Sequence, residues 1–256
     1  MRIAALLQYD GSAFCGFQLQ KGLDIRTVQS DVEKALEIIF SEEVKITAAG
    51  RTDSGVHAVG QVIHFNIPRD MNLQKLAISI NGILEKDVSV RNLFIVPDDF
   101  HSRYSACERE YRYIIHNHYL RSPFSLYRAM WVSLPLNIER MRESASYLIG
   151  EHDFASFCKT CSASEGTVRE IIRIDIDKRD DLIYIDIAGN AFLHNQIRTI
   201  VGTLVSIEKS KSDPVMMKEI LSKKTRLASG DTAPPYGLYF MNVKYDPPLE
   251  SYLSAF

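Results

Sequence analysis

The chain has 256 residues, 46% of them hydrophobic and 24% charged, which is the composition of a soluble globular protein long enough to bury a core. No run of 18 apolar residues occurs, which excludes a conventional membrane-spanning helix, and the start MRIAALLQYDGS has no signal-peptide cleavage site, so we expect a cytoplasmic protein. The net charge of −2 excludes a chain that is basic all over, so a nucleic-acid interface would need a local basic surface.

The first part of the chain alternates predicted strands and helices. The predicted strands follow a period of two, which is typical of half-buried antiparallel strands. The first predicted helix has Thr27 as a plausible N-cap, followed by apolar residues that line one face. The elements expected here are, in chain order, strand 2–10, helix 27–40, strand 60–67, helix 72–84 and strand 88–96.

A similar set of elements follows after about residue 104. Strand 110–117 and helix 137–150 come first, and helix 194–210 comes last. Between them, stretch 173–189 has two arms in which apolar and polar residues alternate, which predicts a hairpin that turns at Lys178 to Asp181. The order predicts an α+β fold of two similar α/β halves that share a central, mostly antiparallel sheet with helices on one face. We place the halves at 1–104 and 105–256.

The chain has four cysteines. Cys158 and Cys161 form a single C-x-x-C, without the further Cys or His pair that a zinc site needs, and within a polar loop rather than at a strand-to-helix junction. We therefore expect free loop thiols, with a thioredoxin-like redox pair as the alternative. We also expect no bound metal.

The segment GRTDSGVHA (50–58) concentrates reactive side chains in a short loop before a strand. Turn-forming residues here present Asp53 next to Arg51, and a neighbouring guanidinium keeps a carboxylate ionised, as a nucleophile or a base requires. The structural alternative is an Asx-turn with an ion pair, and the composition of the loop alone favours that alternative.

Six collinear segments resemble the TruA-type tRNA pseudouridine synthases. Besides the Asp53 loop they are YDGSAFCGFQLQ (9–20), RTVQSDVEKAL (26–36), FHSRYSACEREYRYII (100–115), GNAFLHNQIRTIVG (189–202) and APPYGLYF (233–240). Departures from the family pattern are Phe17 in place of Trp, Gln196 and Thr199 in place of Met and Asn, and the acidic stretch Glu108–Glu110.

This resemblance implies an enzyme that isomerises uridine to pseudouridine in the anticodon stem-loop of tRNA, at positions 38 to 40, without a cofactor. It also implies a homodimer, with the active-site cleft between the two halves of the chain. Base flipping is expected, because the target atoms are inaccessible in a paired stem. Asp53 would be the essential carboxylate, which adds to the uracil ring, attacks the sugar or abstracts a sugar proton.

The resemblance also assigns the neighbours of that carboxylate. Arg51 would pair with it and hold the nucleotide out of the stack, Tyr111 would stack on the uracil, and Arg198 would lie against the carboxylate. Leu238 would line the base pocket. Without the resemblance, Tyr111 and Leu238 would be read as core residues and Arg198 as a surface residue.

Further residues are expected to support the site or to contact the RNA. His57, His101 and Arg103 either support the site or touch phosphates, although a single histidine is more often structural. Arg26 belongs to the basic residues that we expect at phosphates; the others are Lys21, Arg103, Arg109 and Arg112.

Two other functions compete with this enzyme. A non-catalytic RNA-binding protein on the same scaffold would be expected to lack Asp53, Arg51 or Tyr111, and all three are present. A hydrolase built on Asp53 with His57, or a redox protein, would show a nucleophile elbow, a metal cluster or an essential Cys158.

Overall fold

The computed structural model describes residues 1–20, 22–159 and 166–256. The chain packs as two compact units, one formed by Met1–Glu108 together with Phe240–Phe256 and the other by Arg109–Tyr239. Helices and mostly antiparallel strands occur in both units, so the predicted α+β class is confirmed. The predicted halves, 1–104 and 105–256, differ from these units because the C-terminal segment packs within the first one.

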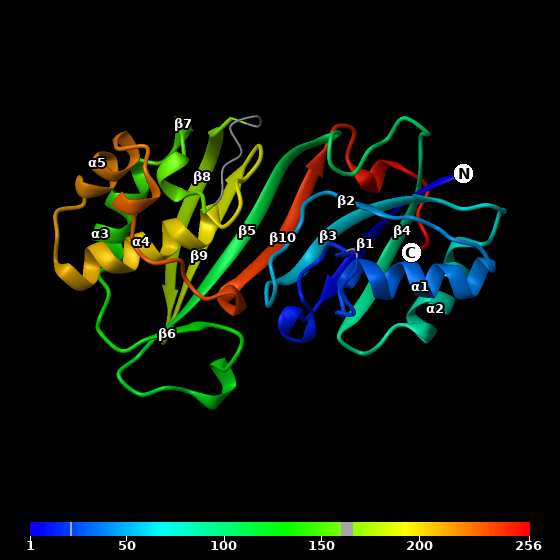
Figure 1. The fold of residues 1–256 in the computed structure, drawn as a ribbon, viewed down its shortest axis with the longest axis horizontal. Helices are drawn as coiled ribbons and strands as arrows, with labels where there is room; N and C mark the ends of the chain where they lie inside the picture. The colour runs from blue at the N-terminus through cyan, green and yellow to red at the C-terminus, as the bar shows by residue number, and fades with distance from the viewer. Residues whose placement is uncertain (21, 160–165) are drawn as a thin grey trace. The chain divides into compact units, whose positions relative to one another are not determined.

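The first unit is built on strands in the order β4-β1-β3-β10. Alternate residues of β1 are all buried, from Ile3 to Tyr9, as the period of two predicts. Helices α1 and α2 pack against each other, and α2 packs against β4 (Figure 1). The elements are β1 (Arg2–Tyr9), α1 (Val28–Phe40), β2 (Thr47–Ala48), β3 (His57–Asn66), α2 (Leu73–Ile83), β4 (Val88–Val96) and β10 (Leu238–Tyr245), the last of which begins in the second unit.

Helix α1 begins where the sequence predicts. The Thr27 side chain accepts a hydrogen bond of 3.1 Å from the backbone N–H of Ser30, and the Ser30 hydroxyl oxygen accepts one of 3.0 Å from the N–H of Thr27. This reciprocal pair satisfies two of the backbone donors that the start of a helix leaves open. The apolar face, which includes Val32 and Leu36, is buried.

The C-terminal segment joins the first unit through backbone contacts. The N–H of Ile95 donates to Leu253 O over 2.9 Å, and the N–H of Ala255 donates to Leu93 O over 2.9 Å. On β3, a Cβ at Gly60 would lie 2.1 Å from Met241 O, so a glycine is required where β10 passes. These contacts explain why the segment belongs with residues far from it in the sequence.

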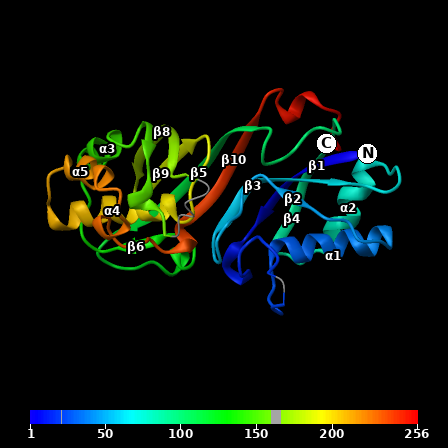
Figure 2. The same ribbon diagram turned by 45° about the horizontal axis from the view of Figure 1, so that its top comes forward.

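The second unit has strands in the order β5-β9-β8-β7, with β6 parallel to β5. The predicted hairpin is present, since Arg179 of β8 pairs with Leu182 of β9 and the turn residue Asp180 has a φ of 52°. Helix α3 packs against β8 and α4, and α4 against α5 (Figures 1 and 2). The elements are β5 (Ala106–Asn117), β6 (Met130–Val132), α3 (Ile138–Ser146), β7 (Gly150–Asp153), β8 (Val168–Arg179), β9 (Leu182–Gly189), α4 (Gln196–Ser210) and α5 (Met216–Ser222).

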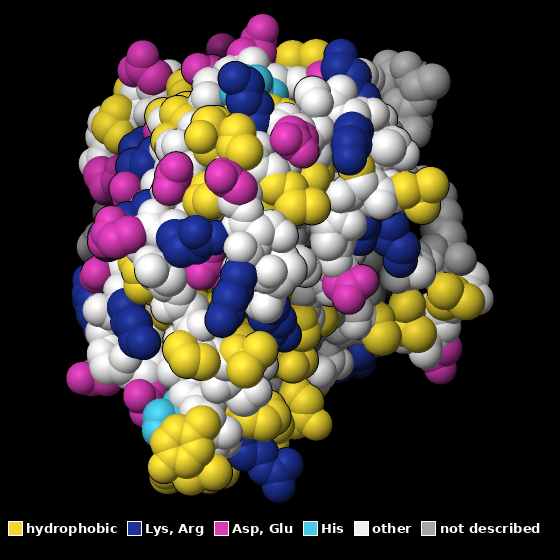
Figure 3. Space-filling model, turned by 90° about the vertical axis from the view of Figure 1, so that its left-hand side faces the viewer, with side chains coloured by type: hydrophobic (Ala, Val, Ile, Leu, Met, Phe, Trp, Pro, Cys, Tyr) yellow, Lys and Arg dark blue, Asp and Glu magenta, His cyan; other side chains and the backbone are white. Residues whose placement is uncertain are grey.

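Two features of the surface bear on function. On the side of the second unit that carries α3 and α5, Lys and Arg are interspersed with Asp and Glu rather than gathered in one patch (Figure 3). The segment between β5 and β6 exposes large apolar side chains, among them Tyr119 and Phe124, and Trp131 of β6 is exposed as well. Among the described residues, no helix is long and apolar enough to cross a membrane.

Candidate active site

The Asp53 loop connects β2 to β3 and is fixed along its length. At its start, the N–H of Ala49 donates to Val62 O over 2.8 Å, and the buried amide of Gln61 donates to Gly50 O over 2.7 Å. At its end, the N–H of Val56 donates to Asp53 O over 3.1 Å and closes a turn. The Asp53 side chain is half-buried and that of Arg51 is exposed, so the loop holds the carboxylate at the surface of the unit.

A buried hydrogen bond lies next to Asp53 in the sequence. The Tyr9 hydroxyl is 2.8 Å from Oγ1 of Thr52, and both side chains are buried. Burial raises the pKa of Tyr9 to about 12, so this phenol stays neutral. On the backbone, the N–H of Phe17 donates to Thr52 O over 3.0 Å. Thr52 is therefore held through both its side chain and its carbonyl.

The segment after β1 packs against the other end of the loop. A Cβ at Gly11 would lie 2.0 Å from Val56 O, so only glycine allows this close approach. The Ser54 hydroxyl donates to Phe14 O over 3.2 Å. Thr52 and Ser54, the residues on either side of Asp53, are thus both bonded to the segment from Tyr9 to Phe17.

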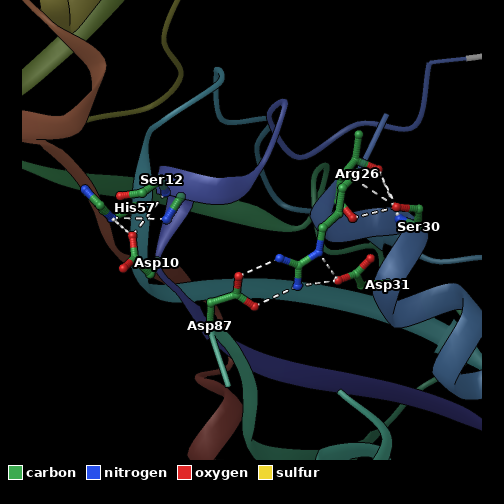
Figure 4. Close-up of polar contacts among 9 residues, drawn as sticks. Asp10, Ser12, Arg26, Ser30, Asp31, His57 and Asp87 are labelled. Atoms are coloured by element: carbon green, nitrogen blue, oxygen red, sulfur yellow. Dashed lines mark hydrogen bonds and ion pairs between the residues drawn. The ribbon is translucent and has the colours of Figure 1, made fainter. Parts of the chain in front are cut away.

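His57 follows the loop as the first residue of β3, and its ring is buried. Its Nδ1 lies 3.1 Å from the N–H of Gly11 and 3.1 Å from Oδ1 of Asp10, which in turn accepts from the N–H of Ser12 over 3.0 Å (Figure 4). His57 thus contacts the segment after β1, at Asp10 and Gly11.

Arg26, expected at an RNA phosphate, is bonded to two carboxylates (Figure 4). Its Nη1 and Nη2 donate to the two oxygens of Asp87 over 2.6 and 2.7 Å, and its Nε donates to Asp31 over 2.9 Å. Its guanidinium carbon lies 4.3 Å from the ring centre of Phe14. The hydrogen bond with Asp87 is the largest cause of the raised pKa of Arg26.

His101 and Arg103 lie in the connection between β4 and β5. Nδ1 of His101 accepts from the N–H groups of Arg103 and Tyr104 over 3.2 and 3.3 Å, and its ring lies 4.7 Å from the ring of His64. Burial lowers the pKa of His101, and nearby Arg2 adds to that effect. The Arg103 side chain is exposed, with its guanidinium 5.6 Å from the ring centre of Tyr104.

Tyr111 belongs to the second unit and lies in the middle of β5. Its ring meets that of Phe192 edge-on with 5.3 Å between the ring centres, and Tyr111 pairs with Ile187 across the sheet. Its neighbour Tyr113 is fully buried, and its hydroxyl donates to Pro234 O over 2.8 Å. Both tyrosines are buried, and Tyr113 is held in the core by a backbone carbonyl.

Arg198 lies in the first turn of α4 and is half-buried. Its Nε donates to Ala233 O over 2.8 Å, and its Nη1 donates to Oδ1 of Asn195 over 2.7 Å. The N–H of Ala233 also donates back to Arg198 O over 3.0 Å. These bonds fix α4 to the segment that leads to Leu238, the buried first residue of β10.

The remaining basic residues expected at phosphates have intramolecular partners where the structure describes them. Arg112 forms two hydrogen bonds with Asp186, of 2.7 and 2.8 Å, and Arg109 donates to Asn190 O over 2.6 Å. Lys21 lies outside the described residues.

Sequence reasoning missed the residues that hold the site. Thr52 and Ser54 are part of the recognised motif, but nothing in the motif shows that Tyr9 and Phe14 are their partners. Phe192 could have been noticed as an aromatic residue in the polar segment GNAFLHNQ. Its contact with Tyr111 comes from the register of β5 and β9, which the sequence leaves open.

The cysteines correct one expectation. Cys158 is disulfide-bonded, so the prediction of a free thiol is wrong for this residue, and Cys161 lies outside the described residues. Cys15 and Cys107 are free and exposed. Within residues 1–20, 22–159 and 166–256, no group of three or more His, Cys, Asp or Glu is placed to hold a metal ion.

Comparison with known proteins places this site in a family. The family model of the tRNA pseudouridine synthases matches residues 5–105 and 144–246, which include the Asp53 loop and Arg198. The tRNA pseudouridine synthase A of Bacillus velezensis is 41% identical over 248 residues, covering 96% of this chain and 100% of that protein. The enzyme of the same name from Coxiella burnetii is 42% identical over 247 residues, covering 96% of this chain and 94% of that protein. The chain belongs to the tRNA pseudouridine synthase family.

Proposed function

We propose that this protein converts uridine to pseudouridine in the anticodon stem-loop of tRNA, at positions 38 to 40, with Asp53 as the essential carboxylate. The observation that carries the proposal is the fixed Asp53 loop, in which both neighbours of a half-buried carboxylate are bonded to the segment from Tyr9 to Phe17. Such a scaffold holds a reactive group in one geometry, which is what catalysis by positioning requires.

The reaction is an isomerisation. The bond between N1 of uracil and C1′ of ribose breaks, a bond between C5 and C1′ forms, and the proton on C5 is lost while N1 gains one. Atoms and electrons balance without an oxidant or a second substrate. Asp53 acts as a nucleophile on the ring or the sugar, or as a base on a sugar proton.

The resemblance to the family supplies the other groups of the proposal. Tyr111 stacks on the flipped uracil, Leu238 lines the base pocket, and Arg198 assists the carboxylate. The contact between Tyr111 and Phe192 supports the stacking role, because an aromatic partner fixes the orientation of the Tyr111 ring. Arg51, exposed beside Asp53, holds the extruded nucleotide. A homodimer and a cytoplasmic location are part of the same proposal.

Incubation of the protein with unmodified tRNA, followed by chemical mapping of pseudouridine, tests this function. We expect product at positions 38 to 40 with the wild type. With Asp53→Asn we expect the single-turnover rate to fall by about 10⁴-fold, while the Kd for tRNA stays within about threefold. Asp70→Asn, which changes an exposed carboxylate of the same unit, is the matched control.

Two outcomes would contradict the proposal. Full product with Asp53→Asn would show that the Asp53 carboxylate is not essential for the reaction. Tight tRNA binding by a wild-type protein that forms no product would favour the non-catalytic RNA-binding alternative. Binding has to be compared at one salt concentration, because phosphate contacts make affinity dependent on salt.

A further inference from the structure

Arg26 occupies the junction of three segments of the first unit. It directly precedes the capped start of α1, and its two carboxylate partners come from different elements: Asp31 lies in the first turn of that helix, and Asp87 directly precedes β4 (Figure 4). The bonds to Asp87 are bidentate, the geometry that a planar guanidinium fulfils and an ammonium does not. The side chains of Arg26, Asp31 and Asp87 are 33%, 21% and 25% exposed, so the cluster is largely covered.

The guanidinium of Arg26 lies over the ring of Phe14, and from Phe14 two contacts lead to the neighbours of Asp53. The Phe14 ring is buried and meets the ring of Tyr9 edge-on at 6.3 Å, and the Tyr9 hydroxyl bonds to Thr52. The backbone carbonyl of Phe14 accepts the hydroxyl of Ser54. One aromatic residue thus connects Arg26 to both sides of the catalytic carboxylate.

Backbone hydrogen bonds also connect the segment after β1 to Arg26 and Asp87. The N–H of Cys15 donates to Arg26 O over 2.9 Å, and the N–H of Asp10 donates to Asp87 O over 2.8 Å. Asp87 therefore contacts the segment after β1 directly, through its carbonyl, and indirectly, through Arg26. These two bonds hold the segment at Asp10 and at Cys15.

A phosphate contact would use the same atoms of Arg26. All three guanidinium nitrogens are bonded to carboxylates, and the ring of Phe14 lies against the guanidinium. A phosphate oxygen would have to compete with two carboxylates that are already in place. The neighbouring negative charges of Asp31 and Asp87 would also repel it.

We propose that Arg26 is a positioning residue for Asp53 and not an RNA ligand: clamped by Asp87 and Asp31, it holds Phe14, and Phe14 holds the loop in which the carboxylate is presented. The inference rests on the proposed catalytic role of Asp53. It also gives Asp87, a residue outside the recognised motifs, a part in positioning Asp53.

The test compares Arg26→Gln and Asp87→Asn in single-turnover reactions with unmodified tRNA, with Kd measured at several salt concentrations. We expect both variants to lose rate by about 10- to 100-fold, since displacement of a reactive group by about 1 Å has that effect. We expect Kd within about threefold of the wild type and an unchanged salt dependence of Kd. The double variant should be no slower than the slower single variant, because both changes break one clamp.

A phosphate contact predicts the opposite pattern. Arg26→Gln would then weaken binding and reduce the slope of log K against log salt by about 1, and Asp87→Asn would leave the rate unchanged and leave or tighten binding. Either result with Asp87→Asn, a wild-type rate or tighter binding, overturns the positioning role. If Arg26→Gln fails to fold, Asp87→Asn and Arg26→Lys still distinguish the positioning role from a phosphate contact. Lysine keeps the positive charge but loses the bidentate geometry.

Two controls separate this inference from simpler effects. Arg69→Gln removes another arginine of the first unit that lies over an aromatic ring, 5.9 Å from the centre of Phe40, and should keep the rate within about twofold. Rates are measured well below the melting temperature of each variant, so that lost stability alone does not lower them. If Asp53→Asn is inactive while Asp87→Asn is fully active, the positioning role of Arg26 is wrong and the proposed function stands. If Asp53→Asn forms product, the proposed function of Asp53 is itself wrong.

Discussion

The hydroxyl of Tyr9 and the side chain of Thr52 form a buried hydrogen bond of 2.8 Å, although 43 residues separate them in the sequence. Tyr9 ends β1, and Thr52 directly precedes Asp53, the proposed catalytic carboxylate. The bond therefore couples the stability of the first unit to the geometry of its reactive loop.

Removal of one partner of this bond should destabilise the protein more than removal of both. Tyr9→Phe leaves Oγ1 of Thr52 buried without its phenol partner, which we expect to cost about 1–3 kcal/mol in the free energy of unfolding. Thr52→Val should cost a similar amount. The double variant should come closer to the wild type, and a urea unfolding series of the four proteins measures this coupling. Strictly additive costs would show that the bond contributes nothing.

Gly11 should tolerate no side chain. Its Cβ would meet the carbonyl of Val56 at 2.0 Å, and a backbone atom cannot rotate away, so Gly11→Ala has to displace the Asp53 loop. We expect this variant to lose most of its single-turnover rate. Gly82→Ala is the matched control, because Gly82 lies in α2 with nothing within 4 Å of the added Cβ; we expect full activity and a stability gain of about 0.5–1 kcal/mol. An active Gly11→Ala enzyme would contradict the close packing.

His64 should make the protein less stable as the pH falls from about 6.5 to about 4. Burial lowers the pKa of His64 to about 4 from 6.5, and the positive charges of His101 and Arg2 add to the effect. Above pH 6.5 the ring is neutral in both states, whereas between the two values only the unfolded chain takes up the proton. Stability is therefore lost toward low pH, by up to about 1.4 kcal/mol per pH unit.

The contribution of His64 is isolated by comparison with a variant that keeps an acceptor for its partner. Nδ1 of His64 accepts from the N–H of Ser102 over 3.2 Å, and the amide oxygen of an asparagine can take its place. His64→Asn should lose less stability than the wild type between pH 6.5 and 4, as measured by urea unfolding at each pH. Parallel curves for the two proteins would disprove the lowered pKa.

Tyr111 and Tyr113 should respond differently to the same kind of change. Tyr111→Phe keeps a stacking ring and should keep the rate within about threefold, whereas Tyr111→Leu should lose about 1–3 kcal/mol of stacking, seen as a rate about 5- to 150-fold lower. Tyr113→Phe removes the hydrogen bond to Pro234 O and should cost about 1 kcal/mol of stability. If Tyr113→Phe lost much of the rate while Tyr111→Leu kept the wild-type rate, Tyr113 and not Tyr111 would be the stacking residue.

Local patterns in the sequence predicted much of the first unit. The capped start of α1, the bounds of β4 and the alternation in β1 all follow from side chains close together in the chain. Predicted helix 137–150 is shorter in the structure, where α3 ends at Ser146 and Gly150, with a φ of 103°, begins β7. The helix α5 was missed because its seven residues are too few to show a clear period.

The contacts that build the site were beyond local patterns. Arg26 was expected at a phosphate because a basic residue in a recognised motif suggests one, and the two carboxylates that bind it are 5 and 61 residues away in the sequence. The same holds for Tyr9 with Thr52 and for Tyr111 with Phe192, whose pairing depends on the register between distant strands. A side chain's chemistry can be read from the sequence, but its partner is set by the fold.

The place of the C-terminal segment has a consequence for biosynthesis. On the ribosome, residues 1–108 emerge first, yet the strand that lies beside β3 and the backbone that pairs with β4 are translated only after the whole second unit. Until then, β3 and β4 of the nascent first unit lack their C-terminal partners, and incompletely paired strand edges invite aggregation and chaperone binding. The half of the protein that carries Asp53 is thus begun first and completed last.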